Sequence, residues 1–151
     1  MKNFLIHLLN YELWANKRVV ETLETLDNPP ARAVAAMGHI LLTQQVWFGR
    51  VLREPTFVSI WEDTPVDWMR ETAERQHRRI VNYVSTVAES DLTQSIDYVN
   101  SKQEAYQGTL LDILTHMSHH AAYHRGQVVQ LIRPMVDEPP VTDFIVWTRE
   151  G

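Results

Sequence analysis

A helical repeat of apolar residues in four long segments limits the fold of this 151-residue chain more than any other feature. The segments cover about 3–26, 32–53, 64–88 and 109–133, and prolines lie close to where they begin or end. Strand-like alternation is confined to a short stretch between the third and fourth segments. We therefore predict an all-α fold, a four-helix bundle formed by a single domain over residues 1–151.

Two of the predicted helices begin with a capping pattern. Thr64-Pro65-Val66-Asp67 offers a cap, a proline at the first helical position and an acid three residues after the cap. Thr109 and Asp112 repeat that spacing at the start of the last helix. In the first helix the repeat places seven residues on the buried side: Phe4, Leu8, Tyr11, Ala15, Val19, Leu23 and Leu26.

Three shorter parts lie outside the helices. Residues 56–63, which include Phe57 and Trp61, are expected to form a packed connection. Residues 95–99 alternate apolar and polar and could pair with 104–107, so we expect a small hairpin or irregular excursion before the last long helix. The tail after Asp137 is too short for a domain, and its apolar residues predict a short C-terminal segment packed on the bundle.

Charge and cysteine content exclude several classes of function. The net charge is −5, and the densest basic group, Arg75, Arg78 and Arg79, has acids beside it, so we expect a solvated face and no nucleic-acid partner. The chain has no cysteine, which excludes disulfides, cysteine–zinc modules and a protein thiol nucleophile. No apolar run approaches the roughly 18–20 residues of a membrane span, and we expect a cytoplasmic protein without a membrane partner.

The stretch HMSHHAAYHRGQ, residues 116–127, contains four of the seven histidines. Residues four apart on an α-helix differ in direction by about 40°, so His116, His120 and His124 form one stripe and His119 faces elsewhere. Two imidazoles one turn apart can bind one metal ion, but a catalytic zinc site usually has three protein ligands. A metal site here would need a third ligand from another helix.

His39 is the best candidate for the third ligand, because it is the only histidine of the second predicted helix. A histidine among apolar residues is more often structural, and the pattern alone leaves both interpretations open. His7 and His77 lack partners, and we interpret them as surface or boundary residues. A di-iron site is excluded, because it needs Glu-x-x-His motifs on two helices and no such pair occurs.

Arg125-Gly126-Gln127 follows the last of these histidines directly. Arg125 could pair with an acid on a neighbouring helix, Gly126 could permit a close approach of another backbone, and Gln127 could bond a buried carbonyl. The simpler interpretation, which we favour, is that all three residues pack the bundle.

Four stretches together resemble the DinB family: NYELWANKRVVETL, GHILLTQQVWFGRVL, HMSHHAAYHRGQVVQLIR and TDFIVWTRE. The resemblance covers essentially the whole chain, and its most specific part is His-x-x-x-His-x-x-x-His-Arg-Gly-Gln. It implies a four-helix bundle that holds a divalent metal ion with one histidine from the second helix and two from the last. On this chain those residues are His39, His120 and His124, and zinc or nickel is the expected metal. His116 then becomes a neighbour of the site, and Tyr123 stands where many relatives have histidine.

The resemblance also implies a reaction. Similar proteins, in this family and in the superfamily with the same bundle, include bacillithiol S-transferases and mycothiol-dependent isomerases, so we expect a low-molecular-weight thiol and a small electrophile as partners. A hydrolase with the same three histidines and a non-catalytic metal-binding stress protein are the alternatives. His116 and Tyr123 are weak candidates for moving protons. Family members are often dimers, and Trp61, Trp68 or Trp147 could supply an interface if exposed. DNA binding ranks last, because the sequence predicts no basic surface.

Overall fold

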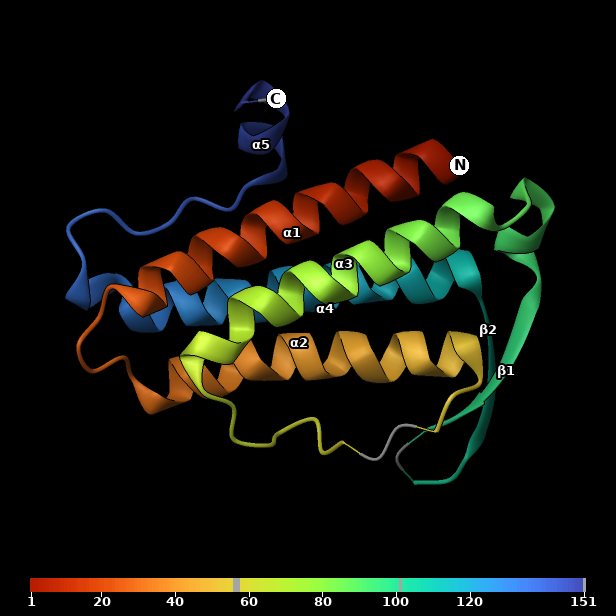
Figure 1. The fold of residues 1–151 in the computed structure, drawn as a ribbon, viewed down its shortest axis with the longest axis horizontal. Coiled ribbons are helices and arrows are strands. Elements are labelled where there is room, and N and C mark those ends of the chain that lie inside the picture. Colours follow the sequence, from red (N-terminus) through yellow and green to blue (C-terminus); the bar gives the residue numbers. More distant parts are fainter. Residues whose placement is uncertain (56–57, 101, 151) are drawn as a thin grey trace.

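Four long helices lie side by side in the computed structural model: α1 (Lys2–Glu24), α2 (Ala31–Leu52), α3 (Val66–Thr86) and α4 (Leu110–Ile132) (Figure 1). The structure describes residues 1–55, 58–100 and 102–150. Helix α2 packs mainly on α4 and α1 packs mainly on α3, while α1 also contacts α4. The predicted all-α four-helix bundle is confirmed. None of the described helices is long and apolar enough to cross a membrane.

The capping prediction is confirmed for α4 and wrong for α3. The Thr109 hydroxyl accepts a hydrogen bond from the Asp112 amide at 3.0 Å, and the Asp112 carboxylate accepts one from the Thr109 amide at 3.3 Å. Helix α3 is capped by Pro65, without a side-chain hydrogen bond. Thr64 instead faces α2, where its Oγ1 would lie 2.1 Å from a Cβ added to Gly38. Its buried hydroxyl has no hydrogen-bond partner among the described residues.

The bundle interior has two hydrophobic clusters with a polar layer between them. One cluster includes Val19, Leu23, Leu41, Met69 and Val128, and the other includes Leu5, Leu9, Phe48, Ile80 and Leu114. The buried polar side chains of the layer are Glu12, Asn16, Gln76, Ser118 and Arg125. The two clusters follow from the amphipathic repeat. The polar layer does not, because it occupies positions at which the repeat would place apolar side chains.

The polar layer also explains the error in the predicted buried side of α1. Tyr11, Ala15, Val19 and Leu23 are buried as predicted, but Phe4 is 61% exposed. The buried face contains Leu5, Leu9, Glu12 and Asn16, one turn apart. A repeat read from apolar residues alone passes over these two buried polar residues, and the predicted face is therefore rotated toward Phe4.

A two-stranded sheet precedes α4, as predicted. Strands β1 (Ser95–Val99) and β2 (Ala105–Thr109) are antiparallel, with Tyr98 opposite Tyr106, and the short 3₁₀ helix η1 (Glu89–Thr93) leads into them. The hairpin lies at the end of the bundle where α2 ends and α4 begins (Figure 1). Ser101, within the predicted turn, lies outside the described residues.

The connection between α2 and α3 runs along α2 (Figure 1). It leaves α2 at Arg53, whose φ of 56° is left-handed, and its described part carries Ile60 and Trp61. Ile60 is half-buried and contacts His39, which agrees with a packed connection, whereas Trp61 is 57% exposed. Phe57, the other residue named in this prediction, lies outside the described residues.

The C-terminal tail packs on α1, as predicted. It continues from α4 through the short η2 (Arg133–Met135) to α5 (Phe144–Glu150). The Tyr11 hydroxyl donates a hydrogen bond to the Thr142 carbonyl at 2.8 Å, and the Tyr11 ring lies 5.1 Å from the ring of Phe144. The indole of Trp14 donates to Glu150 at 3.1 Å.

Candidate metal centre

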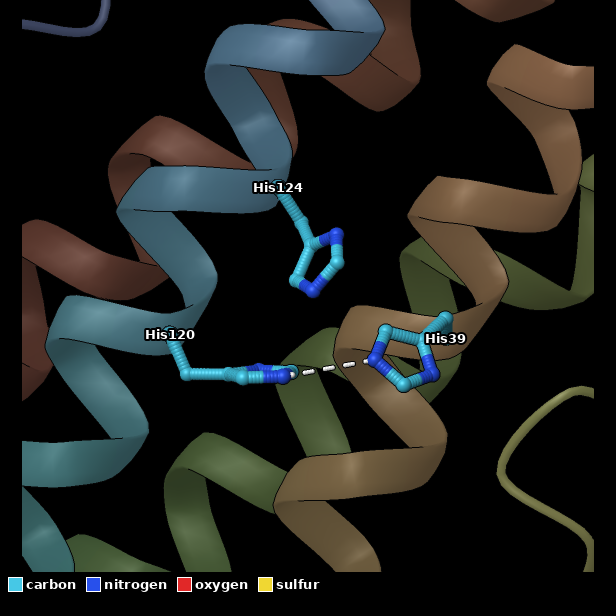
Figure 2. Close-up of side chains that lie close together, drawn as sticks. All are labelled: His39, His120 and His124. Atoms are coloured by element: carbon cyan, nitrogen blue, oxygen red, sulfur yellow. Dashed lines mark hydrogen bonds between the residues drawn. The ribbon is translucent and has the colours of Figure 1, made fainter.

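Three histidines from two helices point toward one another between those helices (Figure 2). His39 comes from α2, and His120 and His124 come from adjacent turns of α4. One ring nitrogen from each lies within 4.8 Å of the others, and the Nε2 atoms of His39 and His120 are 3.3 Å apart. Two ligand nitrogens at roughly 2.0–2.1 Å from a tetrahedral zinc ion are separated by about 3.3–3.4 Å. The predicted trio is therefore brought together, and the distance between His39 and His120 matches that of two zinc ligands.

The connection before α3 holds the His39 ring in place. The Ile60 carbonyl lies 2.7 Å from Nδ1 of His39, so this nitrogen carries the proton and donates it, because a carbonyl can only accept. The Trp61 ring stacks on the imidazole at 3.8 Å between centroids and 10° between planes. Gly38 provides the space for Thr64 of the same connection to pack on α2. The Ile60 carbonyl and the Trp61 ring thus contact His39 directly, and Thr64 packs the same connection against the neighbouring Gly38.

Gln127 holds the imidazole of His124 in place. Its Oε1 lies 3.0 Å from Nδ1 of His124, which donates the hydrogen bond. In His39 and His124 the proton therefore sits on Nδ1, and the lone pair is on Nε2. In His39 this lone pair faces Nε2 of His120 at 3.3 Å, where it can accept a hydrogen bond or bind a metal ion. Metal-binding histidines in proteins are typically oriented in this way by an outer hydrogen-bond acceptor.

Burial and mutual repulsion favour the neutral, metal-binding form of the imidazoles. Burial, together with the neighbouring rings of His124, His39 and His116, lowers the pKa of His120 to about 4. Burial also lowers the pKa of His39, partly opposed by the hydrogen bond to Ile60. At neutral pH, the imidazoles of His39 and His120 are therefore uncharged, which is the state that coordinates a metal ion.

The remaining histidines of the stretch lie around the trio. His116 is exposed, with its ring 5.5 Å from that of His120 and 4.9 Å from that of Trp47. His119 is exposed and stands outside the trio. Tyr123 is 66% exposed, with its ring 5.0 Å from that of His124. Both weak candidates for proton transfer, His116 and Tyr123, thus lie next to a ligand candidate.

His7 and His77 lie away from the trio. The His7 ring is exposed and packs on Trp147 of the tail at 4.5 Å. Nε2 of His77 lies 2.8 Å from Oδ1 of Asn10, and His77 is half-buried. These positions agree with the predicted surface and boundary roles.

A cavity of about 1270 Å³ runs along α2 from Thr43 and Ile60 to the hairpin, and its lining does not include His39, His120 or His124. It reaches the trio through Thr43 and Ile60, which line the cavity and contact His39. Its aromatic lining comes from Trp47 of α2 and from Tyr98 and Tyr106 of the hairpin. Ligand sites in proteins are typically concave, largely apolar and supplied with a few polar groups. A small molecule bound here would have one end beside the histidines.

The three residues after His124 have three different roles. Arg125 pairs with an acid on a neighbouring helix, as one of our interpretations proposed: its guanidinium donates to both carboxylate oxygens of Glu12, at 2.7 and 3.0 Å. Gly126 is exposed, and a Cβ added to it would meet nothing within 4 Å, so the predicted close approach is wrong. Gln127 bonds His124 and not a buried backbone carbonyl, which corrects that prediction too.

Sequence reasoning missed the residues that surround the trio. Trp61 was predicted to belong to a packed connection and considered as an interface residue, but not as a neighbour of His39, and the Ile60 backbone carbonyl leaves no signal in a side-chain pattern. Gln127 could have been found, because it follows His124 by three residues and so lies one turn away on the same face. Glu12 and Asn16, four residues apart on the first helix, could likewise have indicated a polar partner for Arg125.

The fold and the site define the chain as a helical-bundle protein with a three-histidine group that could hold a metal ion. The chain belongs to the DinB family, whose sequence model matches residues 1–150. This match confirms the family that its sequence resembles. Among curated proteins, none matches the chain.

Proposed function

We propose that His39, His120 and His124 bind a divalent metal ion, and that the protein transfers a low-molecular-weight thiol to a small electrophile. The observation that carries the proposal is the convergence of three imidazoles next to Thr43 and Ile60, two residues that line a cavity large enough for two small reactants. Catalytic zinc sites typically use three protein ligands and leave a position for a reactant. The donor set suits zinc or nickel, since neutral imidazole is a good ligand for both.

The residues of the chain would bind, orient and shield the reactants. A divalent cation bound by the histidines would lower the pKa of a thiol and hold it as thiolate beside the electrophile. Trp61 stacks on His39 and covers one side of the site from solvent. The chain has no cysteine, so the thiol would come from solution, and the reducing cytoplasm is where such thiols stay reduced.

The alternatives share the site and differ in its use. A non-catalytic metal-binding stress protein would need the histidines but no substrate cavity, and the cavity beside the trio therefore favours an enzyme. A hydrolase would use the same histidines to activate water. We rank the hydrolase second, because the similar proteins that the family resemblance implies act with a thiol.

Metal analysis and a panel of thiols test the proposal. Protein purified without chelator is expected to contain about one metal ion per chain, and His120→Ala to lose it. His119→Ala, a neighbouring exposed histidine on the same helix, is the matched control and should keep it. The metal-loaded protein is then tested with monochlorobimane and bacillithiol, mycothiol, glutathione or coenzyme A.

The outcomes separate the candidates. Bimane conjugation that needs both the metal and one thiol supports the transferase. Absence of turnover with every thiol, in protein that binds metal, overturns the transferase in favour of the non-catalytic alternative. Turnover of esters or amides without any thiol would indicate the hydrolase. Absence of metal in the wild-type protein would contradict all three.

A homodimer is a further proposal. Of the three tryptophans considered for an interface, Trp61 is exposed, while Trp68 and Trp147 are half-buried against the protein. An interface over Trp61 would also cover His39, onto which its ring is stacked. Sedimentation equilibrium of the wild type and of Trp61→Ala tests this arrangement, because loss of the dimer in the variant is the expected result.

A further inference from the structure

Arg50 lines the cavity at a distance from the histidine trio. It follows His39 by eleven residues on α2, which corresponds to about 16 Å along the helix axis. Its guanidinium carbon lies 4.3 Å from the ring centroid of Trp47 and 5.5 Å from that of Tyr98. Both rings also line the cavity. Aromatic contacts of this kind hold a guanidinium by its face and leave its in-plane N–H donors for a ligand.

The two carboxylates that line the cavity are bonded to residues other than Arg50. Four charged residues line it: Arg50, Arg53, Glu54 and Asp97. Glu54 forms an ion pair with Arg79 of α3, and Asp97 accepts a hydrogen bond from Gln107 across the hairpin at 2.7 Å. Within 1–55, 58–100 and 102–150, no carboxylate lies within ion-pair distance of Arg50.

Three paired arginines of the bundle show the contrast, whereas Arg53, which also lacks an ion pair among the described residues, is exposed to solvent. Arg70 pairs with Glu21 and Glu24, Arg79 with Glu54, and Arg125 with Glu12. Arg50 is half-buried, and burial lowers its pKa, although an arginine remains charged at neutral pH. A partly desolvated cation without an acid costs free energy that an anionic ligand would recover.

We infer that Arg50 binds the carboxylate of an elongated ligand whose other end lies beside His39. Arg50 is the half-buried guanidinium of this wall, Arg53 is exposed, and Glu54 and Asp97 offset the positive charge, which suits one carboxylate better than a phosphate dianion. The aromatic rings of Trp47, Tyr98 and Tyr106 suit the apolar middle of such a molecule. The direction toward His39 rests on the proposed function, where the carboxylate belongs to the thiol or to the electrophile. The contact with Arg50 does not rest on it.

A matched pair of fluorescent probes tests the contact in metal-free protein. Dansylglycine carries a carboxylate, and dansylglycinamide is its neutral counterpart of nearly the same size. Wild-type protein should bind the acid more tightly than the amide. Arg50→Gln should weaken binding of the acid about tenfold and leave the amide within about twofold, since hydrogen bonds to charged groups are the stronger ones. Arg50→Lys should retain part of the preference for the acid.

The control is Arg78→Gln, which removes the same charge from an exposed position on α3. It should leave the ratio of the two affinities unchanged, because an exposed charge on another helix acts only through the screened field of the protein. Equal affinities of the wild type for acid and amide would overturn the inference. It would also be overturned if Arg78→Gln lowered the ratio as much as Arg50→Gln.

Competition identifies the source of the carboxylate. Displacement of dansylglycine by S-methylglutathione would assign the carboxylate to the thiol, and displacement by fumarate would assign it to the electrophile. Displacement by neither, with an acid-to-amide ratio that does not depend on Arg50, would overturn the assignment. Because the probes need neither metal nor turnover, failure of the transferase proposal and failure of the Arg50 site give different results.

Discussion

Helix α4 presents one polar cluster to α1 and another to α2, and the two clusters differ in how their hydrogen-bonding capacity is used. Toward α1, Arg125 is 1% exposed and donates to Glu12, Asn16 and Tyr11, and Ser118 donates to Glu12 at 2.9 Å. Toward α2, Nδ1 of His39 and Nδ1 of His124 are each bonded to an outer acceptor, and Nε2 of His39 faces Nε2 of His120 at 3.3 Å in the shared centre. The first cluster is closed by protein groups except at Nε of Arg125, which has no hydrogen-bond partner among the described residues, and the second is left open for a ligand.

Helix α4 therefore carries one cluster that stabilises the fold and another that could bind a metal ion. Burial alone would lower the pKa of Arg125, but the Glu12 carboxylate outweighs it, and the pKa is raised overall. The guanidinium therefore stays charged and paired. The paired cluster also reaches the C-terminal tail, because Tyr11 bonds both Arg125 and the Thr142 carbonyl. We therefore expect substitutions in the Arg125 cluster to change stability, and substitutions around the histidines to change metal affinity.

The largest effect is expected for Arg125→Met, which leaves the Glu12 carboxylate buried without its cation. Removal of one partner of a buried ion pair typically costs about 3–5 kcal/mol of unfolding free energy. Urea denaturation followed by circular dichroism measures this loss, and isothermal titration of the folded variant should show metal affinity close to the wild type.

The double variant Glu12→Met/Arg125→Met is the control for this prediction. It should be more stable than Arg125→Met alone, because no charge is left unpaired in the interior. A double variant as unstable as the single one would mean that packing, and not the ion pair, carries the effect.

The same comparison shows what the sequence could predict. The histidine trio was predictable because metal ligands need particular residue types at a one-turn spacing, and His120 and His124 meet that requirement on one helix. The third position, His39, followed from its being the only histidine of the second helix and from the family resemblance. The closed cluster was harder, because an acid such as Glu12 within an amphipathic helix is ordinarily assigned to the solvent side, and its burial depends on Arg125 more than a hundred residues later.

Contacts made by backbone atoms, or permitted by a missing side chain, could not be predicted from the pattern of side chains in the sequence. The Ile60 carbonyl and the stacking of Trp61 on His39 follow from the path of a connection that has no periodic sequence. The orientation of Thr64 depends on the absence of a side chain at Gly38, which a capping rule does not consider. The helices were predictable from local periodicity, whereas these contacts come from tertiary packing.

A smaller effect is expected for Gln127→Leu, which removes the acceptor that orients His124. Loss of an outer hydrogen-bond partner of a metal ligand typically weakens metal binding by about 10–100-fold. Isothermal titration with zinc measures the affinity, and stability without metal should change little. Gln127→Glu keeps an oxygen acceptor at the same position and should bind zinc at least as well as the wild type. Equal weakening in both variants would contradict the orienting role.

The pH dependence of stability offers a test of the open cluster without metal. Because the folded pKa of His120 is about 4 and an unfolded histidine titrates near 6.5, the unfolded state takes up this proton first as pH falls. The free energy of unfolding should therefore decrease as pH falls from about 6.5 toward 4, and the contribution should be fully present above that range. In His120→Ala the decrease should be shallower, as measured by urea denaturation in chelator. Parallel profiles for the two proteins would rule out His120 as the source.

The smallest effect is expected for Gly126→Ala, at the residue between the two clusters. Gly126 is exposed within α4, and a Cβ there would meet no atom within 4 Å, so the methyl group can be added without a clash. Glycine in a helix interior is less favourable than alanine by about 0.5–1 kcal/mol, and the variant should be more stable by that amount. Its zinc affinity should equal that of the wild type, because the backbone that carries His124 and Gln127 is already helical. A variant that gains stability but loses zinc affinity would show that the open cluster needs a flexible helix, and that the division between folding and chemistry on α4 is incomplete.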